Sequence, residues 1–358
     1  MSGTRDEKID ALKCVAIVFV IIGHAIVFTS LFPVAGPGRV LVGTVWVQTS
    51  SLNSLLLNVA YSFHMPLFAF LSAYVLFGRE GSPGSLVRKR ALGLLLPYAV
   101  WVGISWVLYG PRTLAGTIDY FKVRALYPQS PNAAWFLYAL FGCFLLFAIV
   151  RALKGRDRML IASAVLMMGV LVLPWVSSNP LGITDIAWLY PFFVMGYLSS
   201  EHAEELRAHR MVLMVSGVVV WAALLPFIWP VLVPELNWWY PELREFLHSM
   251  HLPGAVVVLY AVRYTCAAAA ITALYSLYDY VRGRALTWQA WVGRRTLGMY
   301  VIQPYILMLV SRTISQNWVV LAVAAFGGSL ALTWLLEQNR YTRLVLLGQR
   351  RSRPATTS

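Results

Sequence analysis

The chain is poor in charged residues, which make up 12% of its 358 positions, whereas hydrophobic residues make up 59%. A soluble domain of this size does not need so much apolar sequence. The apolar residues also gather in repeated runs of about 18 residues or more, the length that a bilayer-spanning helix needs. The composition therefore excludes an ordinary soluble protein and predicts a polytopic membrane protein.

Cysteine and acidic residues are scarce as well, with 3 Cys and 15 Asp and Glu against 29 Lys and Arg. Cys14, Cys143 and Cys266 lie in or beside apolar runs, without the spacing of a disulfide framework or a metal site. The net charge of +14 would suggest a nucleic-acid partner in a soluble protein, but here the basic residues cluster in short loops. That placement follows the positive-inside rule, so we expect neither a nucleic-acid partner nor a bound metal.

About ten apolar segments are long enough to cross a bilayer as single helices. The first is too long, and ends too apolar, for a cleaved signal peptide, so we expect it to remain in the protein. In chain order the predicted spans are 11–31, 55–77, 91–109, 133–150, 159–176, 183–199, 211–233, 254–281, 291–310 and 318–336.

An even number of spans places both termini on one side of the membrane. About 22 of the 29 Lys and Arg residues lie on that side and about six in the opposite loops, which indicates a cytoplasmic location for the termini. The predicted fold class is all-α, a polytopic membrane helix bundle of about ten transmembrane helices with both termini cytoplasmic. We expect residues 1–339 to form the membrane domain and 340–358 a basic cytoplasmic tail that is disordered at its end.

The first span carries two ionisable residues, Lys13 and His24. An ionisable group is costly in lipid, so it usually faces the protein interior and has a task. Eleven residues separate the two, which puts them on nearly the same helix face and about 16 Å apart along the axis. They cannot touch, but they can hold two ends of one long molecule. For Lys13 alone, the alternative is an interfacial lysine whose amino group reaches water.

The second span carries His64 and, two residues later, Pro66, which removes a backbone donor and often marks a site. His24 and His64 each lie about 19 Å from the cytoplasmic end of their spans. Because helices joined in sequence tend to pack as neighbours, we predict that both histidines face one cavity, within roughly 10 Å of each other. Lys13 would lie at the cytoplasmic mouth of that cavity. The alternative for His64 is a packed residue bonded to a backbone carbonyl.

Arg263 lies within the eighth span, about 13 Å from its outer edge. Lipid contact does not explain an arginine at this depth, so we predict that it lines the same polar space from the opposite side.

Two short motifs occur in the first two spans: IDALK at 9–13 followed by GH at 23–24, and FHMPLF at 63–68 followed by LSAY at 71–74. Further short motifs are RKR at 88–90 before LPY at 96–98, WFL at 135–137, FFVMGY at 192–197 and GRRTLGMY at 293–300. Together these segments resemble the acyltransferase 3 family of integral membrane acyltransferases. With Lys13 where many members carry arginine, the chain looks most like the fucose 4-O-acetylase-like branch. It departs from the family at Ala73, often a glycine, and at Gln303, often a histidine.

The resemblance implies an O-acyltransferase that moves an acyl group, commonly acetyl from acetyl-CoA, to a hydroxyl of a cell-surface or exported saccharide. It implies a multi-pass protein of the cytoplasmic (inner) membrane that meets membrane lipid, a saccharide or glycolipid acceptor and surface-polysaccharide assembly proteins. Two alternatives stay open. Buried His and Arg are also typical of a proton-coupled small-molecule transporter, and the chain would also suit a component of surface-polysaccharide assembly.

Attack of a hydroxyl on a thioester needs a base, a donor to the oxyanion and a site for coenzyme A. Histidine titrates near neutrality, so we predict His24 as the base. His64 would share that role, hold the tautomer of His24 or donate to the oxyanion, and Arg263 would be a competing ligand of the oxyanion or the acceptor. Lys13 would bind the phosphate end of coenzyme A as a point charge. Further phosphate charge would be held by Arg88, Lys89 and Arg90, for which positive-inside topology is an equally good explanation.

The predicted acceptor side is the loop between the seventh and eighth spans. Aromatic faces with nearby carboxylates suit sugar rings, although an interfacial aromatic belt has the same composition. Trp135 opens the fourth span from the same side and is predicted to line the acceptor route. The loop residues assigned to acceptor binding are Glu235, Trp238, Trp239 and Glu242.

Overall fold

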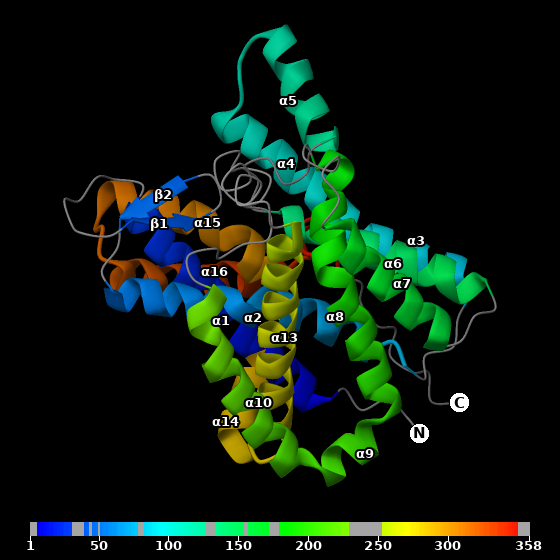
Figure 1. Cartoon of the computed structure of the whole chain (residues 1–358). Coiled ribbons are helices and arrows are strands. Elements are labelled where there is room, and N and C mark those ends of the chain that lie inside the picture. The colour runs from blue at the N-terminus through cyan, green and yellow to red at the C-terminus, as the bar shows by residue number, and fades with distance from the viewer. Residues whose placement is uncertain are drawn as a thin grey trace, which may run out of the picture.

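A computed structural model of the chain describes residues 6–30, 39–42, 45–48, 51–77, 82–126, 134–153, 157–171, 179–228 and 253–349. Each predicted span contains one long helix within these residues (Figure 1). These helices are α1 (Glu7–Ser30), α2 (Ser51–Tyr74), α4 (Leu96–Tyr109), α6 (Trp135–Ala152), α7 (Asp157–Val170), α8 (Ile183–Glu201), α10 (Arg210–Leu224), α13 (Pro253–Leu277), α15 (Thr296–Thr313) and α16 (Trp318–Gln338).

Within the described part of the chain, 6 helical segments are both long and apolar enough to cross a membrane. They are Glu7–Thr29, Leu55–Tyr74, Pro83–Tyr109, Trp135–Ala152, Arg210–Phe227 and Trp318–Gln338. Their outer faces carry exposed hydrophobic side chains such as Val107, Val212 and Val323, as expected of helices that contact lipid. The count of about ten spans and the cytoplasmic location of the termini stay predictions.

The first predicted loop contains a short antiparallel hairpin of β1 (Arg39–Val42) and β2 (Val45–Gln48); the other described elements are helices, so the predicted all-α class is confirmed. The two short runs RVLV and VWVQ, separated by two residues, are a hairpin signal in the sequence.

Other predicted loops contain short helices: α3 (Pro83–Arg90), α5 (Leu114–Leu126), α9 (Ala203–Ala208) and α14 (Gly283–Gly293). α3 begins at a cap, because the Ser82 hydroxyl accepts a hydrogen bond from the Ser85 amide at 3.3 Å and Pro83 occupies the first turn. A π-helical turn at Ala91–Leu95 joins α3 to α4. The basic residues Lys89 and Arg90 therefore lie on a regular helix rather than a loop. The last short helix is α17 (Arg340–Val345), in the predicted tail.

α1 lies at the centre of the bundle and contacts α2, α14, α15 and α16. α2 also packs against α8 and α13, and α10 lies beside α13 (Figure 1). The contact between α2 and α8 requires glycine at 196, because a Cβ there would lie 2.0 Å from the Phe70 carbonyl oxygen. The motif-bearing helices α1 and α2 are thus enclosed by later parts of the chain.

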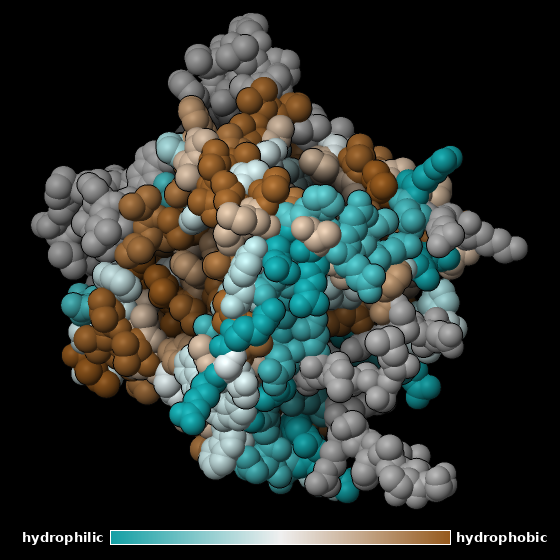
Figure 2. Space-filling model, turned by 90° about the horizontal axis from the view of Figure 1, so that it is seen from below, coloured by the Kyte–Doolittle hydropathy of each residue, from teal (hydrophilic) through white to brown (hydrophobic). Residues whose placement is uncertain are grey.

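Figure 2 shows the face that carries α9 and α14, which is hydrophilic across its middle and hydrophobic toward its upper and left margins. Exposed residues on or next to these two helices include Arg207, Arg282 and Arg284. A polar face with an apolar margin is typical of a helix bundle whose sides meet lipid and whose end meets water.

Candidate active site

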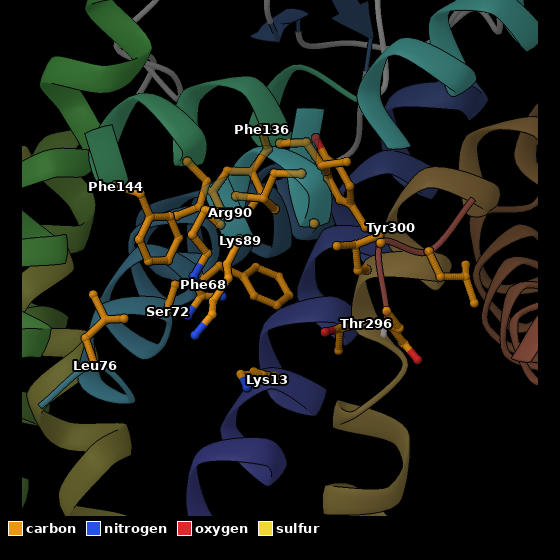
Figure 3. A pocket seen from close by; sticks show the side chains of 18 of the residues that line it. Lys13, Phe68, Ser72, Leu76, Lys89, Arg90, Phe136, Phe144, Thr296 and Tyr300 are labelled. Carbon is orange, nitrogen blue, oxygen red and sulfur yellow. The ribbon is translucent and has the colours of Figure 1, made fainter. Parts of the chain in front are cut away.

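A pocket of about 1180 Å³ is bounded by α1, α2, α3, α6 and α15, together with the ends of α14 and α16 and residues 343–349 (Figure 3). Small-ligand sites commonly measure about 300–1,000 Å³, so this pocket has room for a large ligand. We call it the basic pocket because its described lining has seven cationic side chains and one carboxylate, that of Glu337. The seven cations are Lys13, Lys89, Arg90, Arg151, Arg294, Arg295 and Arg343.

Three of the four residues predicted to bind the cofactor line the basic pocket. Figure 3 shows Lys89 and Arg90 projecting into the same space as Lys13. The Arg90 guanidinium carbon lies 4.3 Å from the Phe144 ring centroid, a cation–π contact that helps to orient it. Arg88, by contrast, is exposed on α3 and is not part of the lining.

Lys13 is held at the pocket wall by an ion pair with Asp10, with 3.0 Å between Nζ and Oδ1. Asp10 is buried, with 2% of its side chain exposed, and Lys13 keeps 20%. The ion pair thus joins a buried carboxylate to a partly exposed amino group, which a ligand in the basic pocket can reach.

The other four cations of the pocket come from a predicted basic loop, from the GRRTLGMY motif at 293–300 and from the predicted tail. Arg295 pairs with Glu337 at 2.9 Å, so Glu337 is already engaged by a cation. Arg151 donates a hydrogen bond to the Tyr197 hydroxyl. Arg343 lies in α17, at the start of the predicted tail. The positive-inside rule already accounts for basic residues in these segments, so their sequence did not predict that they meet in one pocket.

Phe68, Phe136 and Tyr300 form one aromatic group in the lining of the basic pocket. The Phe136 ring centroid lies 5.8 Å from that of Phe68 and 5.8 Å from that of Tyr300. We call these three rings the aromatic collar. His64 lies four residues before Phe68 on α2, and Gln303 three residues after Tyr300 on α15, so each lies about one helical turn from a residue of the collar.

The two predicted catalytic histidines lie on α1 and α2, which pack against each other, and their sharing of one cavity stays a prediction. Next to His24, a Cβ at Gly23 would lie 2.7 Å from the Tyr61 ring, so α1 and α2 approach closely here. The Tyr61 ring centroid lies 4.9 Å from the His64 ring centroid, edge to face. His64 is buried, whereas His24 keeps part of its surface accessible. Neither histidine lines the basic pocket itself.

Each histidine has one defined hydrogen-bond partner. His24 Nδ1 accepts a hydrogen bond from Gln303 Nε2 at 2.6 Å, and His64 Nδ1 donates to the Ala60 carbonyl oxygen, also at 2.6 Å. Gln303 stands where members of the resembling family often have a histidine, and its position in the sequence predicts no role for it. Its contact joins residues 279 positions apart, which local sequence patterns do not reveal.

Arg263 is buried on α13, with its guanidinium carbon 5.6 Å from the Trp188 ring centroid on α8. α13 also contacts α2, the helix of His64. The approach of Arg263 to the two histidines stays a prediction.

Trp135 is the first residue of α6 and packs edge to face on Phe136, a member of the aromatic collar, with 6.0 Å between centroids. The four predicted acceptor residues of the outer loop, Glu235, Trp238, Trp239 and Glu242, lie outside the described residues. Within the described residues, no group of three or more His, Cys, Asp or Glu side chains is placed to hold a metal ion.

The model of an acyltransferase domain matches residues 6–338, which include the basic pocket's α1, α2, α3, α6 and α15 and both histidines. The chain belongs to the acyltransferase 3 family. It is therefore a membrane acyltransferase, and the resemblance noted in the motifs of the first two spans is confirmed.

Among relatives of the chain, nodulation protein NolL of Sinorhizobium fredii is 23% identical over 378 aligned residues, covering 97% of this chain and 93% of that protein. Nodulation protein NolL of Mesorhizobium japonicum is 25% identical over 215 residues, covering 56% of this chain and 49% of that protein. No solved structure matches the chain significantly.

Proposed function

We propose that this acyltransferase moves an acetyl group from acetyl-CoA to a hydroxyl of a cell-surface or exported saccharide. The basic pocket is the observation that carries the donor assignment. Coenzyme A has a diphosphate and a 3′-phosphate, and the pocket offers Lys13, Lys89, Arg90 and four further arginines. Charge-assisted hydrogen bonds to phosphate are stronger than neutral ones, so this lining suits a polyanionic donor.

The shape of the pocket supports the same donor. Lys13 lies about 16 Å from His24 along α1. The aromatic collar lines the pocket, and Phe68 and Tyr300 lie about one helical turn from His64 and Gln303 along their helices. The long pantetheine arm of coenzyme A would extend from the cations toward the collar. The thioester would then reach the level of His24 and His64.

The reaction needs a proton acceptor and an oxyanion donor next to that thioester, and we assign these two roles to His24 and His64. Arg263 on α13 is a further cation for the oxyanion or the acceptor. The acyltransferase family favours this enzymatic use of buried His and Arg over a proton-coupled transporter.

The acceptor assignment is supported by the resemblance to saccharide-modifying members and by the aromatic outer loop. Trp135 at the start of α6 extends the aromatic lining beyond the collar. We place the enzyme in the cytoplasmic (inner) membrane, where it would take a saccharide or glycolipid acceptor and work beside surface-polysaccharide assembly proteins.

Donor binding is tested with the purified full-length protein in detergent. We expect acetyl-CoA to bind measurably tighter than acetyl-pantetheine, which lacks the phosphates. Equal affinity for the two compounds would refute the use of the basic pocket for coenzyme A. The acceptor is tested by mass spectrometry of surface glycans and secreted metabolites from cells with and without the gene. Loss of an acetyl-sized mass only in cells lacking the gene would identify the modified compound.

A further inference from the structure

We infer that Gln303 divides the work between the two histidines, so that His24 donates to the thioester oxygen and His64 is the base. This inference rests on the proposed acetyl transfer. Gln303 thereby has a task that the sequence did not predict, and the roles predicted from the sequence for His24 and His64 are reversed.

The first step is the contact of Gln303 with His24. Gln303 is fully buried on α15 and its amide nitrogen, which can only donate, lies 2.6 Å from His24 Nδ1. Nδ1 must therefore accept, and a neutral imidazole that accepts at Nδ1 carries its proton on Nε2. His24 thus presents an N–H group on the side of the ring that faces away from Gln303.

The second step is the opposite arrangement at His64. Its Nδ1 lies 2.6 Å from the carbonyl oxygen of Ala60, which can only accept. Nδ1 must carry the proton, which leaves a lone pair on Nε2. The Tyr61 ring packs edge to face on this imidazole at 4.9 Å and helps to fix its orientation. The neutral pair therefore offers one donor and one acceptor, as the reaction requires.

The chemistry follows from these protonation states. The acceptor hydroxyl transfers its proton to His64 Nε2 while its oxygen forms a C–O bond to the thioester carbon. The negative charge that develops on the carbonyl oxygen receives the His24 Nε2–H hydrogen bond. When the tetrahedral intermediate collapses, the C–S bond breaks. The thiolate of coenzyme A then takes the proton from the His64 imidazolium, and both histidines return to their starting forms.

Gln303 is a positioning residue in this scheme, since it acts on the reaction through His24. Two substitutions separate its donor function from its volume. Gln303→Met keeps the length of the side chain and removes the N–H donor. Gln303→Glu places a carboxylate next to His24 Nδ1. Because a carboxylate accepts a hydrogen bond, it favours the form of His24 that carries its proton on Nδ1. The matched control is Gln289→Met on α14, which removes the acceptor of the Tyr278 hydroxyl outside the basic pocket.

The direct test is nitrogen-15 magnetic resonance of the full-length protein with labelled histidine, in lipid. Signals are assigned by their loss in His24→Asn and His64→Asn. We expect the wild type to show the Nε2–H form at His24 and the Nδ1–H form at His64. Protonation of His24 at Nδ1 would overturn the inference. This readout does not depend on turnover, so an enzyme that fails to use acetyl-CoA would refute the proposed function and leave the tautomers measurable.

The kinetic test uses the same variants with acetyl-CoA and the identified acceptor. We expect Gln303→Met to lower kcat about tenfold and Gln303→Glu to lower it about a hundredfold or more, because a proton misplaced on His24 Nδ1 removes the hydrogen bond from His24 to the oxyanion. The KM for acetyl-CoA should stay within about twofold, since Gln303 does not line the basic pocket. Wild-type kcat in Gln303→Met, or an equal loss in Gln289→Met, would overturn the assignment.

Discussion

Replacing Lys13 by alanine is expected to weaken acetyl-CoA binding about 10–30-fold. Lys13 lies on the wall of the basic pocket with 20% of its side chain exposed, so a phosphate can reach its amino group. Hydrogen bonds to charged groups contribute about 1.5–3 kcal/mol. Because Asp10 already shares the lysine charge at 3.0 Å, we expect the lower part of that range, about 1.5–2 kcal/mol.

The same substitution removes the ion-pair partner of a buried carboxylate, which by itself destabilises the fold. The double variant Lys13→Ala with Asp10→Asn removes both charges and separates the two effects. We expect it to recover thermal stability relative to the single variant while acetyl-CoA affinity stays weakened. Lys13→Arg keeps the charge and should bind acetyl-CoA within about threefold of the wild type.

The assay is isothermal titration of detergent-purified protein with acetyl-CoA at two salt concentrations, because screening should reduce the contribution of Lys13. Arg88→Ala is the matched control, since Arg88 lies on α3 next to Lys89 but outside the pocket lining. Unchanged affinity in Lys13→Ala would return Lys13 to a purely interfacial role. An equally large loss of affinity in Arg88→Ala would show that acetyl-CoA responds to the overall positive charge of the region and not to a defined pocket.

Three further outcomes are expected. His24→Ala and His64→Ala should each lower kcat at least a hundredfold, about the share of general acid–base and oxyanion assistance, while acetyl-CoA still binds by titration; near-normal turnover in either variant would remove that residue from the mechanism. Gly196→Ala should lower the melting temperature in detergent by several degrees because its Cβ meets backbone at 2.0 Å, whereas Gly169→Ala on α7 meets nothing within 4 Å and should not. Phe136→Ala should open the aromatic collar and raise turnover of butyryl-CoA relative to acetyl-CoA; an unchanged ratio would show that the collar does not limit the acyl chain.

The long apolar runs determined much of the architecture without any tertiary information. A bilayer demands helices of a set length, so the long apolar runs predicted where the long helices lie, and each predicted span contains a helix. The depth and spacing of Lys13 and His24 also followed from the helical rise, because both residues lie on one uninterrupted helix. Short local features were harder to predict. The basic residues at 88–90 made the segment resemble a charged loop, although Ser82 caps the helix α3 there.

Tertiary structure alone decided which residues share a site. The basic residues of α3, α6, α17 and the segment joining α14 to α15 are far apart in sequence, and the positive-inside rule assigns them all the same explanation. Packing around α1 brings them into one pocket, while Arg88, adjacent to Lys89, faces away from it. The hydrogen bond between Gln303 and His24 likewise requires α15 to pack on α1. Periodicity shows which face of a helix a residue occupies, but only the packing of helices decides which partner that face meets.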